Sequence, residues 1–134
     1  MSNLPAFGEY AAAFESSLQD GDWGRLERFF APDATYLPGD GTEAIGRDAV
    51  LRAFQDSVNA LEGKCDSREL LKEPELSESG DTVTLKFTAR YTKKGLPDLI
   101  LSGYETAQYS NGLIRKMEDV FDDPSALVSW REQL

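Results

Sequence analysis

Two carboxylates, Glu105 and Asp119, lie in neighbouring segments of alternating apolar and polar residues that meet at Ser110-Asn111-Gly112. Alternate side chains of an extended strand point to the same face. Glu105 therefore shares a face with Leu99, Leu101, Gly103, Ala107 and Tyr109, and Asp119 shares one with Leu113, Met117 and Phe121. A lone charge among apolar groups is costly unless it is neutralised or paired. The pattern predicts a cavity that contains two acidic groups.

The turn between the segments suggests how the two acids meet. A three-residue loop with a left-handed Gly112 would pair Tyr109 with Leu113 and Gly103 with Asp119. Glu105 and Asp119 would then be diagonal neighbours, with Cβ atoms about 7–8 Å apart. Ionisation of one acid at that separation raises the pKa of the other, so one can stay protonated. We expect a general acid/base pair, in which one group donates a proton to a carbonyl or hydroxyl and the other accepts one.

Composition limits the partners that the chain can have. The sequence has 134 residues and 40% hydrophobic content, which predicts a single domain over residues 1–134 with a core of its own. Lysine and arginine total 14 against 24 acidic residues, a formal charge of −10 that repels nucleic acid and anionic membranes. No apolar stretch is long enough to span a bilayer. We expect neither nucleic acid nor membrane as a partner.

The available side chains also limit the chemistry. Histidine is absent and Cys65 is the only cysteine, so histidine-dependent triads are excluded and the usual zinc ligands are missing. We therefore expect no metal and no cofactor, with proton transfer left to Asp, Glu, Tyr, Lys or water. The first residues have neither the basic end nor the apolar run of a secretory signal, which favours a cytoplasmic location.

Hydrophobic periodicity predicts the elements that position the acids. Apolar residues at helical spacing predict helices over residues 5–19 and 47–62, with a short helix from Asp22 between them. Strands are predicted at 34–37, at 83–91 and on both sides of the turn described above, and a short helix follows Asp122. Residues 65–76 form a weaker strand, which Pro74 places at an edge. This order predicts an α+β fold, in which a curved antiparallel or mixed sheet wraps a helix and leaves an internal pocket.

Several motifs resemble one superfamily over nearly the whole chain. They are Asp20-Gly21-Asp22-Trp23, the run from Phe29 to Tyr36, Gly46-Arg47-Asp48-Ala49-Val50, and Gly112-Leu113-Ile114 through Asp119-Val120-Phe121-Asp122. They resemble the nuclear transport factor 2-like superfamily, in its SnoaL-like and ketosteroid-isomerase-like branch. The resemblance implies a cone-shaped α+β barrel, with three N-terminal helices on a strongly curved sheet, that is often a homodimer. The fold carries isomerases, cyclases, dehydratases and non-catalytic binders, so it does not by itself assign an activity.

The resemblance gives several residues an expected role. Asp119 matches an aspartate that faces the cavity in SnoaL-like proteins and can act as base, whereas Met117 stands where many of them have histidine. Glu105 stands where ketosteroid isomerases have a protonated acid. Phe14 and Pro38 replace their tyrosine and their basic aspartate, which disfavours steroid isomerisation.

We therefore predict a pocket for a small organic molecule that carries a carbonyl or hydroxyl group. Asp119 would be the base, Glu105 the acid or polarising group, and Tyr36 would orient the substrate for isomerisation, cyclisation or dehydration. The predicted ligand-binding residues are Phe14, Trp23, Phe54, Tyr91, Gly103 and Met117.

Plainer interpretations remain open. Glu105 is on the same predicted face as Arg115 and would then form a structural ion pair inside a dimer interface, while Asp119 would cap or pair in a similar way. The aromatic residues would serve the core alone. The missing histidine and isomerase residues favour the alternative that the chain is a non-catalytic ligand-binding or dimerisation module.

Overall fold

Helix α1 spans Leu4–Asp20 in the computed structural model, which describes residues 2–134. Phe7 and Tyr10 are buried on its inner stripe. The helix ends at Gly21, which adopts the left-handed conformation with φ 74° and donates its N–H to Ser17 O at 2.9 Å. The helix predicted over residues 5–19 is thus found with an extra residue at each end.

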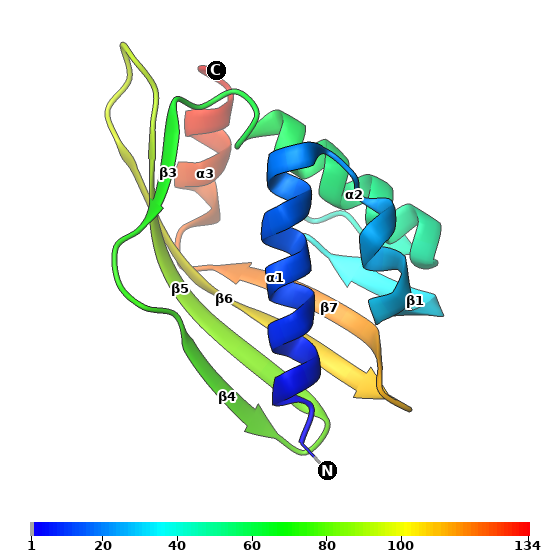
Figure 1. Cartoon of the computed structure of the whole chain (residues 1–134). Coiled ribbons are helices and arrows are strands. Elements are labelled where there is room, and N and C mark those ends of the chain that lie inside the picture. Colours follow the sequence, from blue (N-terminus) through cyan, green and yellow to red (C-terminus); the bar gives the residue numbers. More distant parts are fainter. Residues whose placement is uncertain (1) are drawn as a thin grey trace.

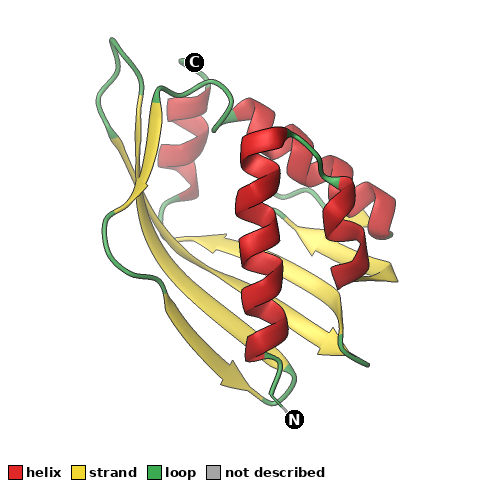
Figure 2. Ribbon diagram, viewed as in Figure 1, coloured by secondary structure: helices red, strands yellow, loops and turns green. Residues whose placement is uncertain are grey.

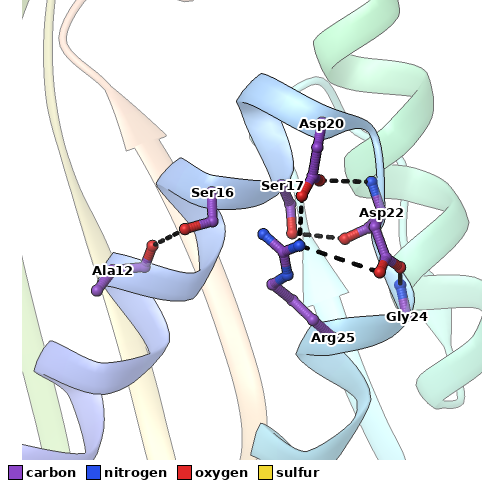
Figure 3. A network of polar contacts seen from close by, with 7 residues as sticks. All are labelled: Ala12, Ser16, Ser17, Asp20, Asp22, Gly24 and Arg25. Atoms are coloured by element: carbon purple, nitrogen blue, oxygen red, sulfur yellow. Dashed lines mark hydrogen bonds and ion pairs between the residues drawn. The ribbon is translucent and has the colours of Figure 1, made fainter.

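A polar network joins α1 to the next element (Figure 3). Ser17 Oγ donates to Asp22 O at 2.7 Å, and Arg25 forms an ion pair with Asp20. The segment that follows, η1 (Gly24–Phe29), is a 3₁₀ helix that buries Leu26 and Phe29. The short helix predicted from Asp22 is therefore present as a tighter and shorter turn.

Strand β1 (Phe30–Leu37) begins four residues before the predicted strand and contains Pro32. Its pairing with β7 is irregular between Phe30 and Thr35, and this break in the ladder accommodates a residue that has no N–H to donate. A two-residue strand, β2 (Ala44–Ile45), was not predicted. Helix α2 (Arg47–Ala60) follows and ends two residues earlier than expected.

The remaining strands are β3 (Ser67–Leu70), β4 (Glu75–Ser79), β5 (Thr82–Thr92), β6 (Leu99–Ser110) and β7 (Leu113–Phe121). The sheet order is β2-β1-β7-β6-β5-β3, and β4 also pairs with β5. Among the strands of residues 2–134, only β1 and β7 pair in parallel, so the sheet is mixed. Pro74 precedes β4, so the weak strand predicted over 65–76 is divided into two short strands along β5.

The β6–β7 hairpin differs from the predicted register. Asn111 and Gly112 both have positive φ, 52° and 79°, which is the geometry of a two-residue turn in place of the expected three-residue loop. Ser110 pairs with Leu113, and a bulge then leaves Arg115 unpaired between the Tyr109–Ile114 and Gln108–Lys116 pairs. Beyond the bulge, Glu105 pairs directly with Asp119. The predicted diagonal arrangement is therefore wrong, and the acids are closer neighbours than expected.

The helices lie on one side of the curved sheet (Figures 1 and 2). Helix α3 (Pro124–Arg131) lies near one end of the sheet, where the Trp130 indole N–H donates to Pro97 O at 2.7 Å. One buried cluster joins α1, α2, β1 and β7. A second cluster surrounds α3, the C-terminal end of β5 and the N-terminal end of β6. This arrangement is the expected α+β cone with helices packed on a curved, unclosed sheet. None of the described helices is long and apolar enough to cross a membrane.

Candidate functional site

A cavity of about 560 Å³ lies between the helices and the concave face of the sheet. Most of its wall is apolar and comes from α1, α2, α3, β5 and β6. Its size is in the range of pockets that hold drug-sized molecules. Glu105, Asp119 and Tyr36, the three residues predicted to carry the chemistry, all line it.

These three residues form one connected group. The Tyr36 hydroxyl donates a hydrogen bond to Asp119 Oδ2, and the Tyr36 ring packs on Phe54 with ring centres 4.7 Å apart. Direct pairing across an antiparallel ladder holds the Glu105 and Asp119 Cβ atoms about 4.5–5.5 Å apart. Three strands, β1, β6 and β7, thus bring a hydroxyl and two carboxyls to one point on the cavity wall.

Burial and charge keep one proton on the acid pair. Removal from water, the Asp119 charge and a hydrogen bond to Asp119 raise the pKa of Glu105 well above its ordinary value. Burial also raises the pKa of Asp119, but hydrogen bonds from Glu105 and Tyr36 oppose that rise. Among the described residues, the buried Asp119 Oδ1 has no hydrogen-bond partner, and a protonated Glu105, its direct neighbour across the ladder, has an O–H to donate. The favoured state has Glu105 neutral and Asp119 ionised.

Both acids retain some exposed surface although protein surrounds them. That surface faces the cavity. The pair is therefore accessible to a small molecule in the cavity although it is poorly hydrated. A buried pair with unequal proton affinities is an arrangement that can move protons on a bound compound.

The structure divides the predicted ligand-binding residues into two groups. Phe14, Phe54 and Tyr91 line the cavity. Trp23 and Met117 are buried beside it in the core, where Trp23 packs edge-on to Phe14 and Met117 Sδ accepts a 3.5 Å hydrogen bond from Tyr10.

Gly103 has a structural reason to be glycine. A Cβ atom at this position would lie 2.2 Å from Val120 O on the neighbouring strand. Gly103 lies outside the cavity lining and permits the close approach of β6 and β7, two residues from Glu105. The role of Gly103 in ligand binding stays a prediction, and the close packing of the two strands is enough to explain the glycine.

Arg115 does not pair with Glu105. The bulge turns both Arg115 and Lys116 outward, so that Arg115 Nη2 lies 3.9 Å from Asp33 Oδ2 on the surface. Ile114 takes the inward position and is fully buried. The ion-pair interpretation of Glu105 is therefore wrong.

A second group of polar side chains lines the same cavity, and sequence reasoning found only Tyr91 of it. The Tyr91 hydroxyl donates to Glu62 Oε1 at 3.2 Å, and Arg68 Nη2 lies 3.5 Å from Glu15 Oε1. Burial raises the pKa of Glu62. The sequence did indicate that Glu62 faces inward, because it continues the four-residue helical spacing of Phe54 and Val58.

The residues that the structure describes hold no group of three or more side chains of the kinds that bind metal ions. The acidic residues near the end of β7 do not converge, since Glu118 and Asp119 alternate in direction along the strand.

Comparisons with known proteins agree with the fold. The model of the SnoaL-like domain matches residues 10–117. TerC, crystallised with polyporic acid, superposes with a TM-score of 0.64 at 21% identity, over 92% of this chain and 94% of TerC. A putative polyketide cyclase from Xanthomonas campestris pv. campestris gives 0.65 at 21% identity, over 98% of both chains.

An NTF2-like protein of unknown function from Burkholderia pseudomallei gives a TM-score of 0.67 at 23% identity, over 98% of this chain and 97% of the other. These identities support the fold alone. Comparison with curated proteins gave no match. The match to the SnoaL-like domain covers most of the sequence, and the cone of helices on a curved sheet agrees with it. The chain therefore belongs to the SnoaL-like domain family of the nuclear transport factor 2-like superfamily.

Proposed function

We propose that this protein binds a small, mostly apolar organic molecule and transfers protons on its carbonyl or hydroxyl group. The observation that carries the proposal is the direct pairing of Glu105 with Asp119 on the wall of an apolar cavity, with Tyr36 donating to Asp119. The crystal of TerC with polyporic acid supports a small organic ligand, because that protein has the same fold.

In this proposal each group has its own task. Asp119, the ionised partner, takes a proton from a carbon next to the carbonyl, and the electrons of that C–H bond form the enol double bond. Glu105, the neutral partner, gives its proton to the carbonyl oxygen, so that no net charge develops on the ligand. Tyr36 holds Asp119 in place through its hydroxyl hydrogen bond. Return of a proton to a different carbon gives an isomer, and attack of the enol on a second carbonyl gives a ring.

A carboxyl-carbon NMR titration of the ligand-free protein tests the proposal. One of the two acids should titrate well above the ordinary range of about 4, with Asp119 below Glu105. Ordinary values for both would contradict acid/base chemistry. Asp119→Asn should then abolish exchange of ligand protons with deuterated water, while Tyr109→Phe, a change at a buried ring outside the cavity, should leave it intact.

A second candidate is a non-catalytic binding or dimerisation module. Met117 occupies the place of the histidine found in related proteins, and it is buried away from the cavity. Ile100 and Tyr104, on one face of β6, are exposed apolar side chains suited to contact with a second copy. Native mass measurement should find twice the 14.9 kDa chain mass, and Ile100→Lys should shift that equilibrium toward the single chain if this surface is used.

A further inference from the structure

The second polar group of the cavity lies where three elements meet. Arg68 of β3 pairs across the ladder with Tyr91 of β5, and Glu62 follows the end of α2. The Tyr91 hydroxyl donates to Glu62 Oε1 at 3.2 Å. All three side chains line the cavity that also contains the acid pair.

The register of the sheet places the two polar groups far apart. Leu85 of β5 is paired with Glu105, and Tyr91 is six residues further along the same strand. At about 3.3 Å per residue this is about 20 Å along the strand, and sheet curvature shortens the distance between the inward side chains. Phe87 and Ala89, the inward residues between them, also line the cavity and form an apolar floor.

The charges in the cavity favour an uncharged ligand. The acid pair with its single proton carries one negative charge. Four further acidic side chains line the cavity against two basic ones, Arg68 and Arg131; the acidic ones are Glu15, Asp40, Glu62 and Glu73. The whole chain adds a net charge of −10. An anionic group entering this cavity would meet repulsion at both ends.

We propose that Glu62, Tyr91 and Arg68 form a second binding position, which holds a hydroxyl group at the end of the ligand remote from the acid pair. A hydroxyl suits this position because it can donate to the Glu62 carboxyl or to Tyr91 Oη, whose own proton is given to Glu62, and can accept from Arg68. The ligand class is then an uncharged, elongated and mostly apolar molecule with a carbonyl at one end and a hydroxyl at the other. The carbonyl end of this description rests on the proposed function.

The experiment compares three probes by isothermal titration calorimetry with the whole protein: 4-acetylbiphenyl, 4-acetyl-4′-hydroxybiphenyl and 4′-acetylbiphenyl-4-carboxylate. The hydroxyl probe should bind about five to ten times more tightly than 4-acetylbiphenyl, since one satisfied hydrogen bond has about this value. The carboxylate probe should bind more weakly than either.

Two variants test which residues cause that preference. Tyr91→Phe should remove most of the advantage of the hydroxyl probe, and Glu62→Gln should reduce the penalty of the carboxylate probe by removing the opposing charge. Tyr109→Phe is the matched control, because it deletes a buried tyrosine hydroxyl that lies outside the cavity lining. Circular dichroism melting of each variant confirms that it is folded, and Glu62→Gln still tests the proposal if Tyr91→Phe fails to fold.

Equal affinities of the three probes for the unmodified protein would overturn the second binding position. Failure of all three to bind at their solubility limits would overturn it too, as would a hydroxyl preference that Tyr91→Phe retains or a carboxylate penalty that Glu62→Gln leaves unchanged. The proposed function fails separately. If the protein does not exchange the acetyl protons of bound probes with deuterated water, yet prefers the hydroxyl probe, acid/base chemistry is wrong and the binding position stands.

Discussion

Glu105 and Asp119 are directly opposed on neighbouring strands, so the protein bears an electrostatic cost that a surface pair would not have. The structure reduces this cost through one retained proton and one tyrosine hydrogen bond. The retained proton and the hydrogen bond both alter pKa values in the folded state. A group whose pKa differs between the folded and unfolded states makes the free energy of unfolding depend on pH, so the protonation of the site and the stability of the fold are linked.

Glu105→Gln should stabilise the protein at neutral pH. The pKa of Glu105 is raised in the folded state, so the unfolded chain releases this proton at lower pH and the free energy of unfolding falls as pH rises above about 4.5. Glutamine stays neutral in both states and escapes this loss. Each unit of pKa difference between the folded and unfolded states corresponds to about 1.4 kcal/mol, so the gain at pH 7 increases with the rise in the Glu105 pKa.

Urea unfolding at pH 7 and pH 4 measures this effect. The gain should shrink at pH 4, where Glu105 is protonated in both states. The charged or titratable groups that face Glu105 are Asp119 on β7, Tyr36 on β1, Tyr10 on α1 and Tyr109 on its own strand. A variant less stable than the parent at pH 7 and unchanged at pH 4 would contradict a proton held on Glu105.

Tyr36→Phe should raise the pKa of Asp119 further. The hydroxyl hydrogen bond from Tyr36 favours the charged carboxylate, so its loss makes Asp119 hold a proton more strongly. Carboxyl-carbon NMR of Asp119 measures the shift, and Tyr109→Phe serves as the control that should leave Asp119 unchanged. An unaltered Asp119 titration in Tyr36→Phe would show that the hydroxyl does not act on this group.

At the scale of elements, the β6–β7 hairpin decides where the acids lie. A two-residue turn followed by a bulge at Arg115 moves the pairing by two residues relative to the bulge-free loop predicted from sequence. The alternation of Glu105 and Asp119 with apolar residues was enough to predict their inward direction. It was not enough to predict their register, because a bulge depends on how both strands pack and not on the spacing within one of them.

Gly103→Ala should destabilise the hairpin strongly. The added Cβ would lie 2.2 Å from Val120 O, a backbone atom that cannot rotate away, so the strands must separate. We expect a loss of about 2–4 kcal/mol in the free energy of unfolding, measured by urea titration.

Gly8→Ala is the matched control for this change. A Cβ at Gly8 has no neighbour within 4 Å, and the residue is inside helix α1, so alanine should stabilise the protein by about 0.5–1 kcal/mol. If Gly103→Ala matched Gly8→Ala in stability, the close approach of β6 and β7 would be disproved.

The long helices were predicted within two residues at each end, because a repeated apolar stripe marks α1 and α2 clearly. Strand β1 was predicted too short because Pro32 is a local signal against a strand, and only the irregular pairing with β7 overrides it. Glu62 and Arg68 were missed for a different reason, although Tyr91 of the same group was predicted. Its members come from separate elements, and nothing in the sequence relates the end of α2 to the pairing of β3 with β5.

At the scale of the whole molecule, the net charge of −10 lowers the free energy of unfolding. Like charges repel one another more in the folded chain than in the expanded one, and salt screens that repulsion. Addition of sodium chloride to a low-salt solution at pH 7 should therefore raise the free energy of unfolding by about 1 kcal/mol. The same titration near pH 4.4, where the net charge is close to zero, should show a much smaller effect. A decrease with salt at pH 7 would mean that the ion pairs contribute more than the repulsion.

Helix α3 lines the cavity through Leu127 and is fastened by the bond from Trp130 to Pro97. It contributes no acid, yet it helps to keep bulk solvent from the acids that precede it in the chain. Under the proposed function, the proton affinities of Glu105 and Asp119 would thus depend partly on a helix that contributes neither carboxyl. Substitutions confined to that helix would shift the pKa values of the two carboxyls without changing either carboxyl itself.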